Sequence, residues 1–245
     1  MAWYAYCITE QATFQQGRVR RPFCIDSLKG IADSPVKGFP SGEFVVLVSE
    51  LADDAQLTQQ AILEHARVVS NCFRLATVLP FRFGTVFSSD EALRQAVRTN
   101  RRAFSESIAH LHGKAEMRIR VMLREDAPLP EILLKGLPEK AGGEYLSWLR
   151  IKATRDRERQ TRARALSVQV HKLFNPLQEE VSCKKIEKGV TIEIAHLIDT
   201  AGVEKYQSRY SSAMRQFKNC DIRLSGPWPP YHFMPGKIRT VGGNG

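Results

Sequence analysis

The chain has 245 residues, of which 43% are hydrophobic and 25% charged, as is typical of a water-soluble protein with one large domain or two smaller ones. No stretch approaches the roughly 18 apolar residues of a membrane-spanning helix, and the start, MAWYAYCITE, lacks the basic and apolar regions of a signal peptide. We therefore expect a cytoplasmic protein that does not enter a membrane.

The positive charge is concentrated in the second half of the chain. The net charge is +10. Residues 1–112 contain 12 Lys and Arg against 11 Asp and Glu, whereas residues 113–245 contain 24 against 15. This asymmetry predicts either an acidic partner for the second half or a charge that only promotes solubility.

In the first half, short apolar runs predict strands, and apolar residues three and four positions apart predict helices. We expect strands at 3–9, 23–28, 36–38 and 44–48. A helix at 56–73 follows a cap at Asp53 or Asp54, and a second runs from 91 to 111 with an interruption at Asn100. Between these helices, Pro80 and Gly84 exclude a regular helix over 78–87.

The second half shows a clear alternation of strands and helices. Residues 115–123 alternate with period two, and a Pro-rich link with a short helical stretch to 135 follows. We then expect a helix at 143–177, a hairpin at 181–186 and 190–197, a helix at 200–219 and a strand at 220–224. This order, β-α-β-β-α-β, is the ferredoxin-like arrangement with a long first helix.

The predicted fold class is therefore α+β with two domains. An N-terminal α+β domain occupies 1–112, and a ferredoxin-like domain occupies 113–226. Residues 227–245 form an extended C-terminal strap and tail.

Signatures of catalysis and of cofactor binding are missing from the sequence. It contains no GxxxxGK[ST], no GxGxxG after a strand, no GxSxG, no HExxH and no closely spaced cysteine pair. His110 and His112 end a helix, where a spacing of two points them apart, and His65 lies on an apolar stripe as a core histidine would. The five cysteines are single and are expected to be reduced. We predict no enzyme, and no catalytic, cofactor-binding or metal-binding residues.

A basic run occupies residues 150–164, where seven Lys and Arg face only Asp156 and Glu158. One interpretation is a partner-binding patch around Arg155, Arg159 and Arg162, for nucleic acid or for an acidic protein surface. The other is the solvated middle of a long helix. Trp148 is the one aromatic residue near the run, which weakens the nucleic-acid interpretation because base stacking needs aromatic rings.

Three segments are unusual in composition: YAYCIT (4–9), VLPFRFGTVF (78–87) and SGPWPPYHF (225–233). Together they resemble the gas vesicle protein F/L (GvpF/GvpL) family, and GKAEMRIRV (113–121) and GGEYL (142–146) fall between them in the expected order. The resemblance covers nearly the whole chain, to about residue 234. Residues 11–25 are more basic and polar than expected of the family, and residues 235–245 lie outside its motif.

The resemblance implies a non-catalytic, accessory protein of gas vesicle assembly with a ferredoxin-like C-terminal domain. We therefore predict that the chain binds the gas vesicle shell protein (GvpA-type), together with other accessory gas vesicle proteins, and assists nucleation or assembly of the vesicle. It would be cytoplasmic and associated with gas vesicles. The alternative function is a basic, nucleic-acid-binding ferredoxin-like module.

The two longer motifs supply the candidate structural residues: Pro80, Phe81, Arg82, Phe83, Gly84, Gly226, Pro227, Trp228, Pro229, Pro230 and Tyr231. In an extended first motif, Phe81 and Phe83 would face one side and Arg82 the other. Arg82 would then be either a buried clamp paired with a carboxylate or carbonyls, or a contact to a partner. Gly84 would allow a turn of the backbone.

The prolines of the second motif predict an extended chain that cannot continue a sheet. Its aromatic residues, Trp228, Tyr231 and Phe233, would either strap the two domains together or bind the shell protein. With the strap interpretation, the partner-binding face lies elsewhere, on the basic helix or at an exposed edge of the N-terminal sheet.

Overall fold

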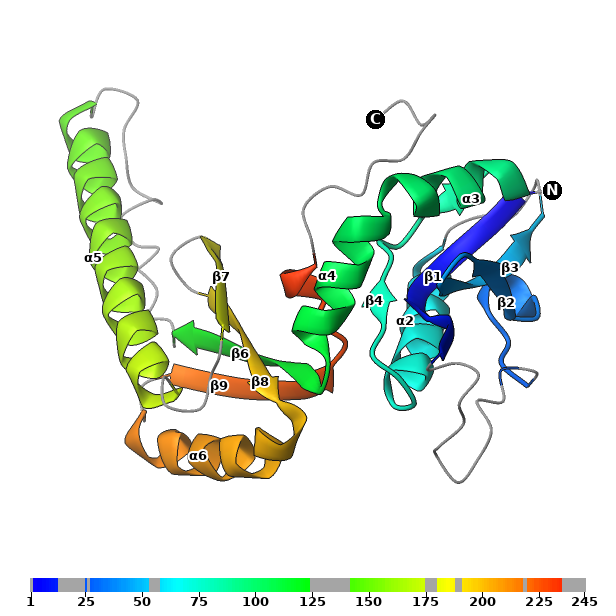
Figure 1. Cartoon of the computed structure of the whole chain (residues 1–245). Helices are drawn as coiled ribbons and strands as arrows, with labels where there is room; N and C mark the ends of the chain where they lie inside the picture. Colours follow the sequence, from blue (N-terminus) through cyan, green and yellow to red (C-terminus); the bar gives the residue numbers. More distant parts are fainter. Residues whose placement is uncertain are drawn as a thin grey trace. The chain divides into compact units, whose positions relative to one another are not determined.

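A computed structural model describes residues 2–12, 25, 27–52, 58–123, 142–174, 180–187, 191–217 and 220–234. The chain divides into two compact units. The first unit combines Met1–Glu116 with Trp228–Gly245, and the second is Met117–Pro227. The described residues form two sheets and five α-helices, which confirms the α+β class (Figure 1).

The first unit is built on a five-stranded sheet with the order β2-β3-β1-β4, in which β5 also pairs with β1. Its strands are β1 (Ala2–Glu10), β2 (Lys37–Ser41), β3 (Phe44–Leu51), β4 (Leu79–Pro80) and β5 (Val86–Phe87). The central strand β1 pairs antiparallel with β3, β4 and β5. It is buried along almost its whole length, as its apolar sequence requires.

Helices cover both faces of this sheet: α2 (Gln59–Phe73) on one, and α3 (Asp90–Thr99) and α4 (Arg101–Leu111) on the other. The interruption expected at Asn100 is confirmed, and Ser89 caps α3 by accepting a hydrogen bond from the Ala92 amide. The cap expected at Asp53 or Asp54 is wrong, because α2 begins at Gln59 and the Thr58 hydroxyl accepts from the Ala61 amide.

Two short strands of the first unit differ from expectation. The strand expected at 36–38 is displaced and becomes β2, from Lys37 to Ser41. The described part of 23–28 forms no strand: the Leu28 amide closes a turn on the Ile25 carbonyl at 2.8 Å. A 3-10 turn, η1 (Ile31–Asp33), follows and contributes Ile31 to the core.

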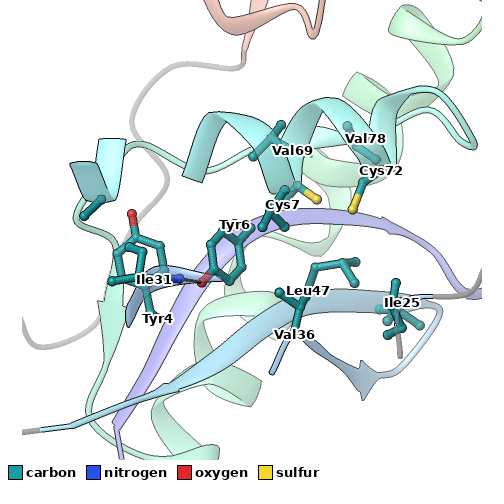
Figure 2. Packing of buried hydrophobic residues seen from close by; sticks show 13 residues of the cluster. Tyr4, Tyr6, Cys7, Ile25, Ile31, Val36, Leu47, Val69, Cys72 and Val78 are labelled. Atoms are coloured by element: carbon teal, nitrogen blue, oxygen red, sulfur yellow. Dashed lines mark hydrogen bonds between the residues drawn. The ribbon is translucent and has the colours of Figure 1, made fainter. Parts of the chain in front are cut away.

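A β-bulge in β1 shapes the core beneath α2. The pairing register with β3 shifts between Ala5 and Cys7, so that Tyr6 is the extra residue. Tyr6 and Cys7 consequently both point to the α2 side, and the Cys7 thiol lies beside that of Cys72 on α2 (Figure 2). Burial raises the pKa of Cys7 well above its usual value, which keeps this thiol protonated at neutral pH.

The second unit follows the predicted order β-α-β-β-α-β. Its elements are β6 (Lys114–Leu123, the first residues of which lie in the first unit), α5 (Gly142–Phe174), β7 (Glu180–Glu187), β8 (Thr191–Asp199), η4 (Thr200–Gly202), α6 (Val203–Gln216) and β9 (Cys220–Trp228). The strands lie in the order β7-β8-β6-β9. The short helical stretch expected near residue 135 lies outside the described residues.

One face of this second sheet carries the core. Alternate residues of β6, namely Met117, Ile119 and Val121, pack with side chains from α5 and α6. The other face carries polar side chains, including the ion pairs Arg120–Glu193 and Arg223–Asp221. The alternation read from the sequence of β6 is therefore confirmed where its side chains are described.

The two halves of α5 differ. Its C-terminal half supplies Ala163, Val170 and Phe174 to the core. Over 146–162, by contrast, every side chain is exposed or only half-buried, and the helix extends past the sheet (Figure 1).

Candidate functional site

The first family motif forms a loop that leaves and rejoins the central strand β1. The Phe81 amide donates to the Tyr6 carbonyl at 2.8 Å, and the Ala5 amide donates to the Thr85 carbonyl at 3.0 Å. Between these contacts the chain turns, and both the amide and the hydroxyl of Thr85 donate to the Arg82 carbonyl. Gly84 has φ +86°, a conformation that glycine adopts readily and other residues rarely do.

The turn separates the two phenylalanines of this motif. Phe81 is buried against Phe87 and Phe104, with ring centroids 6.1 and 6.4 Å away, on the side of α4. Phe83 packs instead against Tyr4 and His65, on the side of α2. The expectation that both face one side is wrong because the chain is not extended between them.

Arg82 is exposed at the tip of this loop. Among the residues that the structure describes, no carboxylate pairs with its guanidinium. The buried clamp considered from the sequence is therefore not formed there, and a contact to a partner stays a prediction.

A buried polar network holds the loop from below. The Tyr4 hydroxyl accepts from the Gly84 amide at 3.1 Å and lies 2.9 Å from Nδ1 of His65. The phenol and the imidazole share one hydrogen bond, whose direction depends on the tautomer of His65. The neighbouring Tyr6 hydroxyl accepts from the Ile31 amide (Figure 2) and shares a hydrogen bond of 2.7 Å with the Ser49 hydroxyl.

Burial fixes the protonation states in this network. It raises the pKa of Tyr4 to about 12 and lowers the pKa of His65 to about 4, a lowering that the Phe81 backbone partly offsets. His65 is thus neutral at pH 7. Its Nε2 has no hydrogen-bond partner among the described residues.

The C-terminal motif returns the chain to the first unit. Strand β9 runs through Gly226 and Pro227 to Trp228, so the expectation that the motif cannot continue a sheet is wrong. The proline is tolerated because β9 is the edge strand of its sheet. Gly226 has φ +122°, which only glycine adopts readily.

Beyond β9, a 3-10 turn, η5 (Tyr231–Phe233), replaces the fully extended chain that was expected. Pro229 and Pro230 are buried, Tyr231 packs against the core beneath α2, and Trp228 remains 40% exposed. Two aromatic side chains of the motif therefore differ: Tyr231 is packed in the fold, whereas Trp228 is exposed to solvent.

A buried carboxylate anchors this turn. Glu116 of β6 is fully buried, and its two oxygens accept from the backbone amide of His232 at 2.8 Å and from Nδ1 of His232 at 2.7 Å. Sequence analysis missed this pair, since nothing in the spacing of two residues 116 positions apart indicates contact.

The predicted partner-binding residues lie together on one side of α5. Arg162 is exposed, and Arg155 and Arg159 are half-buried. They stand three and four residues apart, so they share a helix face. Glu158 approaches Arg162 at 3.8 Å, a weak pair because both side chains are more than half exposed.

The second sheet gives little support to the alternative that the chain binds nucleic acid. Sheets that bind RNA stack bases on aromatic side chains of their open face. The four strands of this sheet contain one aromatic residue, Trp228, at the very end of β9. The edge of the first sheet is also a poor docking strand, because β2 has five residues and contains Pro40.

No metal-binding cluster of three or more His, Cys, Asp or Glu occurs among the described residues. His112, part of the HxH pair, has its Nδ1 3.3 Å from the Thr77 hydroxyl at the end of α4. Within the same described part of the chain, no helix is long and apolar enough to cross a membrane.

The chain is thus an α+β protein of two units. Its two unusual motifs are packed into the fold and leave Arg82 and Trp228 exposed. The model of the family described as "Gas vesicle synthesis protein GvpL/GvpF" matches residues 2–235, and the chain belongs to this family. It is a family of structural and accessory gas vesicle proteins that is not known for enzymes.

Relatives and solved structures agree with this assignment. The chain is 22% identical to gas vesicle protein F of Streptomyces sp. (strain CB03234), over 89% of this chain and 96% of the relative. It is 25% identical to gas vesicle protein L1 of Halobacterium salinarum, over 95% and 90%. The crystal structure of GvpF from Anabaena sp. PCC7120 matches with a TM-score of 0.75 and 18% identity, over 99% of both chains. GvpF from Microcystis aeruginosa matches with a TM-score of 0.70 and 19% identity, over 96% of this chain and 99% of that one.

Proposed function

We propose that this protein binds the gas vesicle shell protein (GvpA-type) and assists nucleation or assembly of the vesicle, in the cytoplasm and in contact with other accessory gas vesicle proteins. Membership of the GvpL/GvpF family over residues 2–235 is the observation that carries the proposal. The exposed Arg82 loop and the exposed Trp228 offer contact points that the folded core does not use.

A pull-down with purified shell protein tests this function. We expect the full chain to retain the shell protein at moderate salt, and deletion of the gene in a vesicle-forming cell to reduce vesicle number. No retention at any salt concentration would contradict the proposal. Retention of RNA instead, falling steeply as salt rises, would favour the nucleic-acid alternative.

We further propose that the second unit is a ferredoxin-like domain, with domain limits near 112 and 226. The order β-α-β-β-α-β and the strand order β7-β8-β6-β9 support this assignment. The motif residues Pro80 to Gly84 and Gly226 to Tyr231 would then serve mainly to shape and pack the fold.

In the same proposal, residues 227–245 act as a strap that stabilises the chain rather than as the shell-binding segment. The packed Tyr231 and the Glu116–His232 hydrogen bonds support it. Truncation after Ser225 should lower the melting temperature, and so should the smaller change Glu116→Ala. A truncated chain that keeps its melting temperature and loses only the shell protein would show that the strap idea is wrong.

A further inference from the structure

Helix α2 has an uncharged row of exposed side chains on the side that faces away from its core contacts. The row consists of Gln59, Ile62, Leu63 and Ala66. The last three stand three, four and seven residues after the first, which places all four on one side of the helix. Ile62 is 47% exposed and Leu63 is 62% exposed. We call this row the α2 ridge.

The two charged side chains of α2 are both engaged on one flank of the helix. A carboxylate oxygen of Glu64 accepts from the Ala32 amide at 3.2 Å, and the Arg67 guanidinium donates to the Lys29 carbonyl at 2.8 Å. Both therefore reach towards η1 and its neighbour rather than across the ridge. The exposed sides of the other two helices of the first unit, α3 and α4, instead carry Glu91, Arg98, Arg101, Arg102 and Glu106.

The opposite flank of α2 borders the loop of the first family motif. This loop joins β4 and β5, which pair with β1 on the side away from β3. Its Phe83 ring lies 5.9 Å from the ring of His65, one helical turn after Ile62. By contrast, η1 lies towards β3, because the Tyr6 hydroxyl bonds both the Ile31 amide and Ser49 of β3. The α2 ridge thus runs between η1 and the exposed Arg82 loop.

The ridge and the loop together define the chemistry of a partner. Exposed aliphatic side chains such as Ile62 and Leu63 leave water favourably when they pack against other apolar side chains. The Arg82 guanidinium has no carboxylate partner among the described residues, so an Asp or Glu of the partner would complement it. A nucleic acid would need several cations along its phosphates, and the ridge offers none.

We propose that the α2 ridge and Arg82 form the surface on which the shell protein docks, with apolar side chains against the ridge and a carboxylate opposite Arg82. This inference rests on the proposed function, since it assigns the binding of the shell protein to one surface of the first unit. A second copy of this chain is a poorer occupant, because its matching surface brings another Arg82 instead of a carboxylate.

Polar substitution of exposed apolar side chains gives a matched test. The ridge variant is Ile62→Gln with Leu63→Gln in the full chain. The control variant is Val168→Gln with Met214→Gln, on helices of the second unit, where these side chains are 52% and 38% exposed. Each variant removes two exposed apolar side chains and leaves the net charge unchanged. Circular dichroism and melting temperature check the fold, and Ile62→Ala with Leu63→Ala replaces the ridge variant if that one does not fold.

The pull-down with purified shell protein supplies the readout. The natural chain should retain the shell protein at moderate salt, and the ridge variant should bind it at least tenfold more weakly. The control variant should lose less than twofold. Arg82→Glu should weaken binding more than Arg82→Lys, because the lysine keeps the positive charge that a carboxylate of the partner requires.

A photo-crosslinking amino acid tests the contact directly. Placed at position 63, it should crosslink to the shell protein, whereas at position 168 it should not. Equal retention of the shell protein by the natural chain and the ridge variant would overturn this inference and leave the proposed function standing. No retention by the natural chain would remove the proposed function, and this inference with it. A crosslink from position 63 to a second copy of the chain, in place of the shell protein, would assign the ridge to self-association instead.

Discussion

Each of the two units contains a buried histidine bonded to a buried tyrosine, and the two pairs serve different ends. In the first unit, His65 comes from a helix and Tyr4 from a strand, and the Tyr4 hydroxyl also accepts from Gly84 in an exposed loop. In the second unit, His196 comes from β8 and Tyr206 from α6, and the Tyr206 ring stacks on Phe174 of α5 at 4.6 Å. The first pair thus supports a surface loop, whereas the second joins two helices to a sheet.

The electrostatics of the two pairs are nonetheless alike. Burial lowers the pKa of His196 to about 4, with a smaller contribution from the nearby His171, and burial raises the pKa of Tyr206. His196 is therefore neutral at pH 7, like His65. Nε2 of each histidine lacks a hydrogen-bond partner among the described residues. Both cores thus tolerate a neutral imidazole with one ring nitrogen that lacks a hydrogen-bond partner among the described residues. Both should lose stability when that imidazole is protonated, because a buried charge is costly.

Of the changes considered, a lower pH should therefore reduce the stability of the protein most, and it should destabilise both units. An unfolded histidine has a pKa of about 6.5, so below that pH the unfolded chain binds more protons than the folded one. Stability is complete above about pH 6.5 and falls as the pH drops towards 4, by as much as about 3 kcal/mol for each histidine. Urea unfolding at several pH values measures this fall. His65→Gln and His196→Gln should each remove part of the pH dependence, and an unchanged profile in both variants would contradict the assignment.

Removal of the tyrosine hydroxyl should lower the free energy of unfolding by different amounts in the two pairs. Tyr4→Phe leaves both the Gly84 amide and His65 without their partner, which should cost about 2 kcal/mol. Tyr206→Phe deprives only His196 and should cost about 1 kcal/mol. Hydrogen exchange at the Gly84 amide gives a second readout, because it should accelerate in the Tyr4 variant alone. Equal acceleration in both variants would mean that the loop is not held by Tyr4.

The smallest effect on stability is expected at the exposed tip of the first motif. Arg82→Ala removes a side chain with no carboxylate partner in the described residues, so the unfolding free energy should change by less than about 0.5 kcal/mol. If the loop contacts the shell protein, retention in the pull-down should fall although the melting temperature is unchanged. A large drop in melting temperature would instead restore the clamp interpretation.

The sequence predicted the elements well where a long periodic pattern was present. The alternation of β6, the break at Asn100 and the order of elements in the second unit are all observed. The family followed from three unusual segments, and the match over residues 2–235 confirms it.

Predictions failed where distant residues decide the outcome. The proline in β9 looks like a strand breaker until its place at the sheet edge is known. The side on which Phe83 lies depends on hydrogen bonds from the loop to β1, which no local pattern contains. Nor does a local pattern indicate that Glu116 would be buried and bonded by His232.

The sequence of the second unit is inserted into that of the first, and this order has a consequence for synthesis. Residues 117–227 interrupt the first unit, which Trp228 and the residues after it complete. A ribosome therefore delivers Glu116 long before Tyr231 and His232. Until residues 228–234 emerge, the core beneath α2 lacks Tyr231, and Glu116 lacks its two hydrogen bonds to His232. The nascent first unit should thus reach full stability only after these residues have left the ribosome, whereas the second unit has its whole sequence earlier.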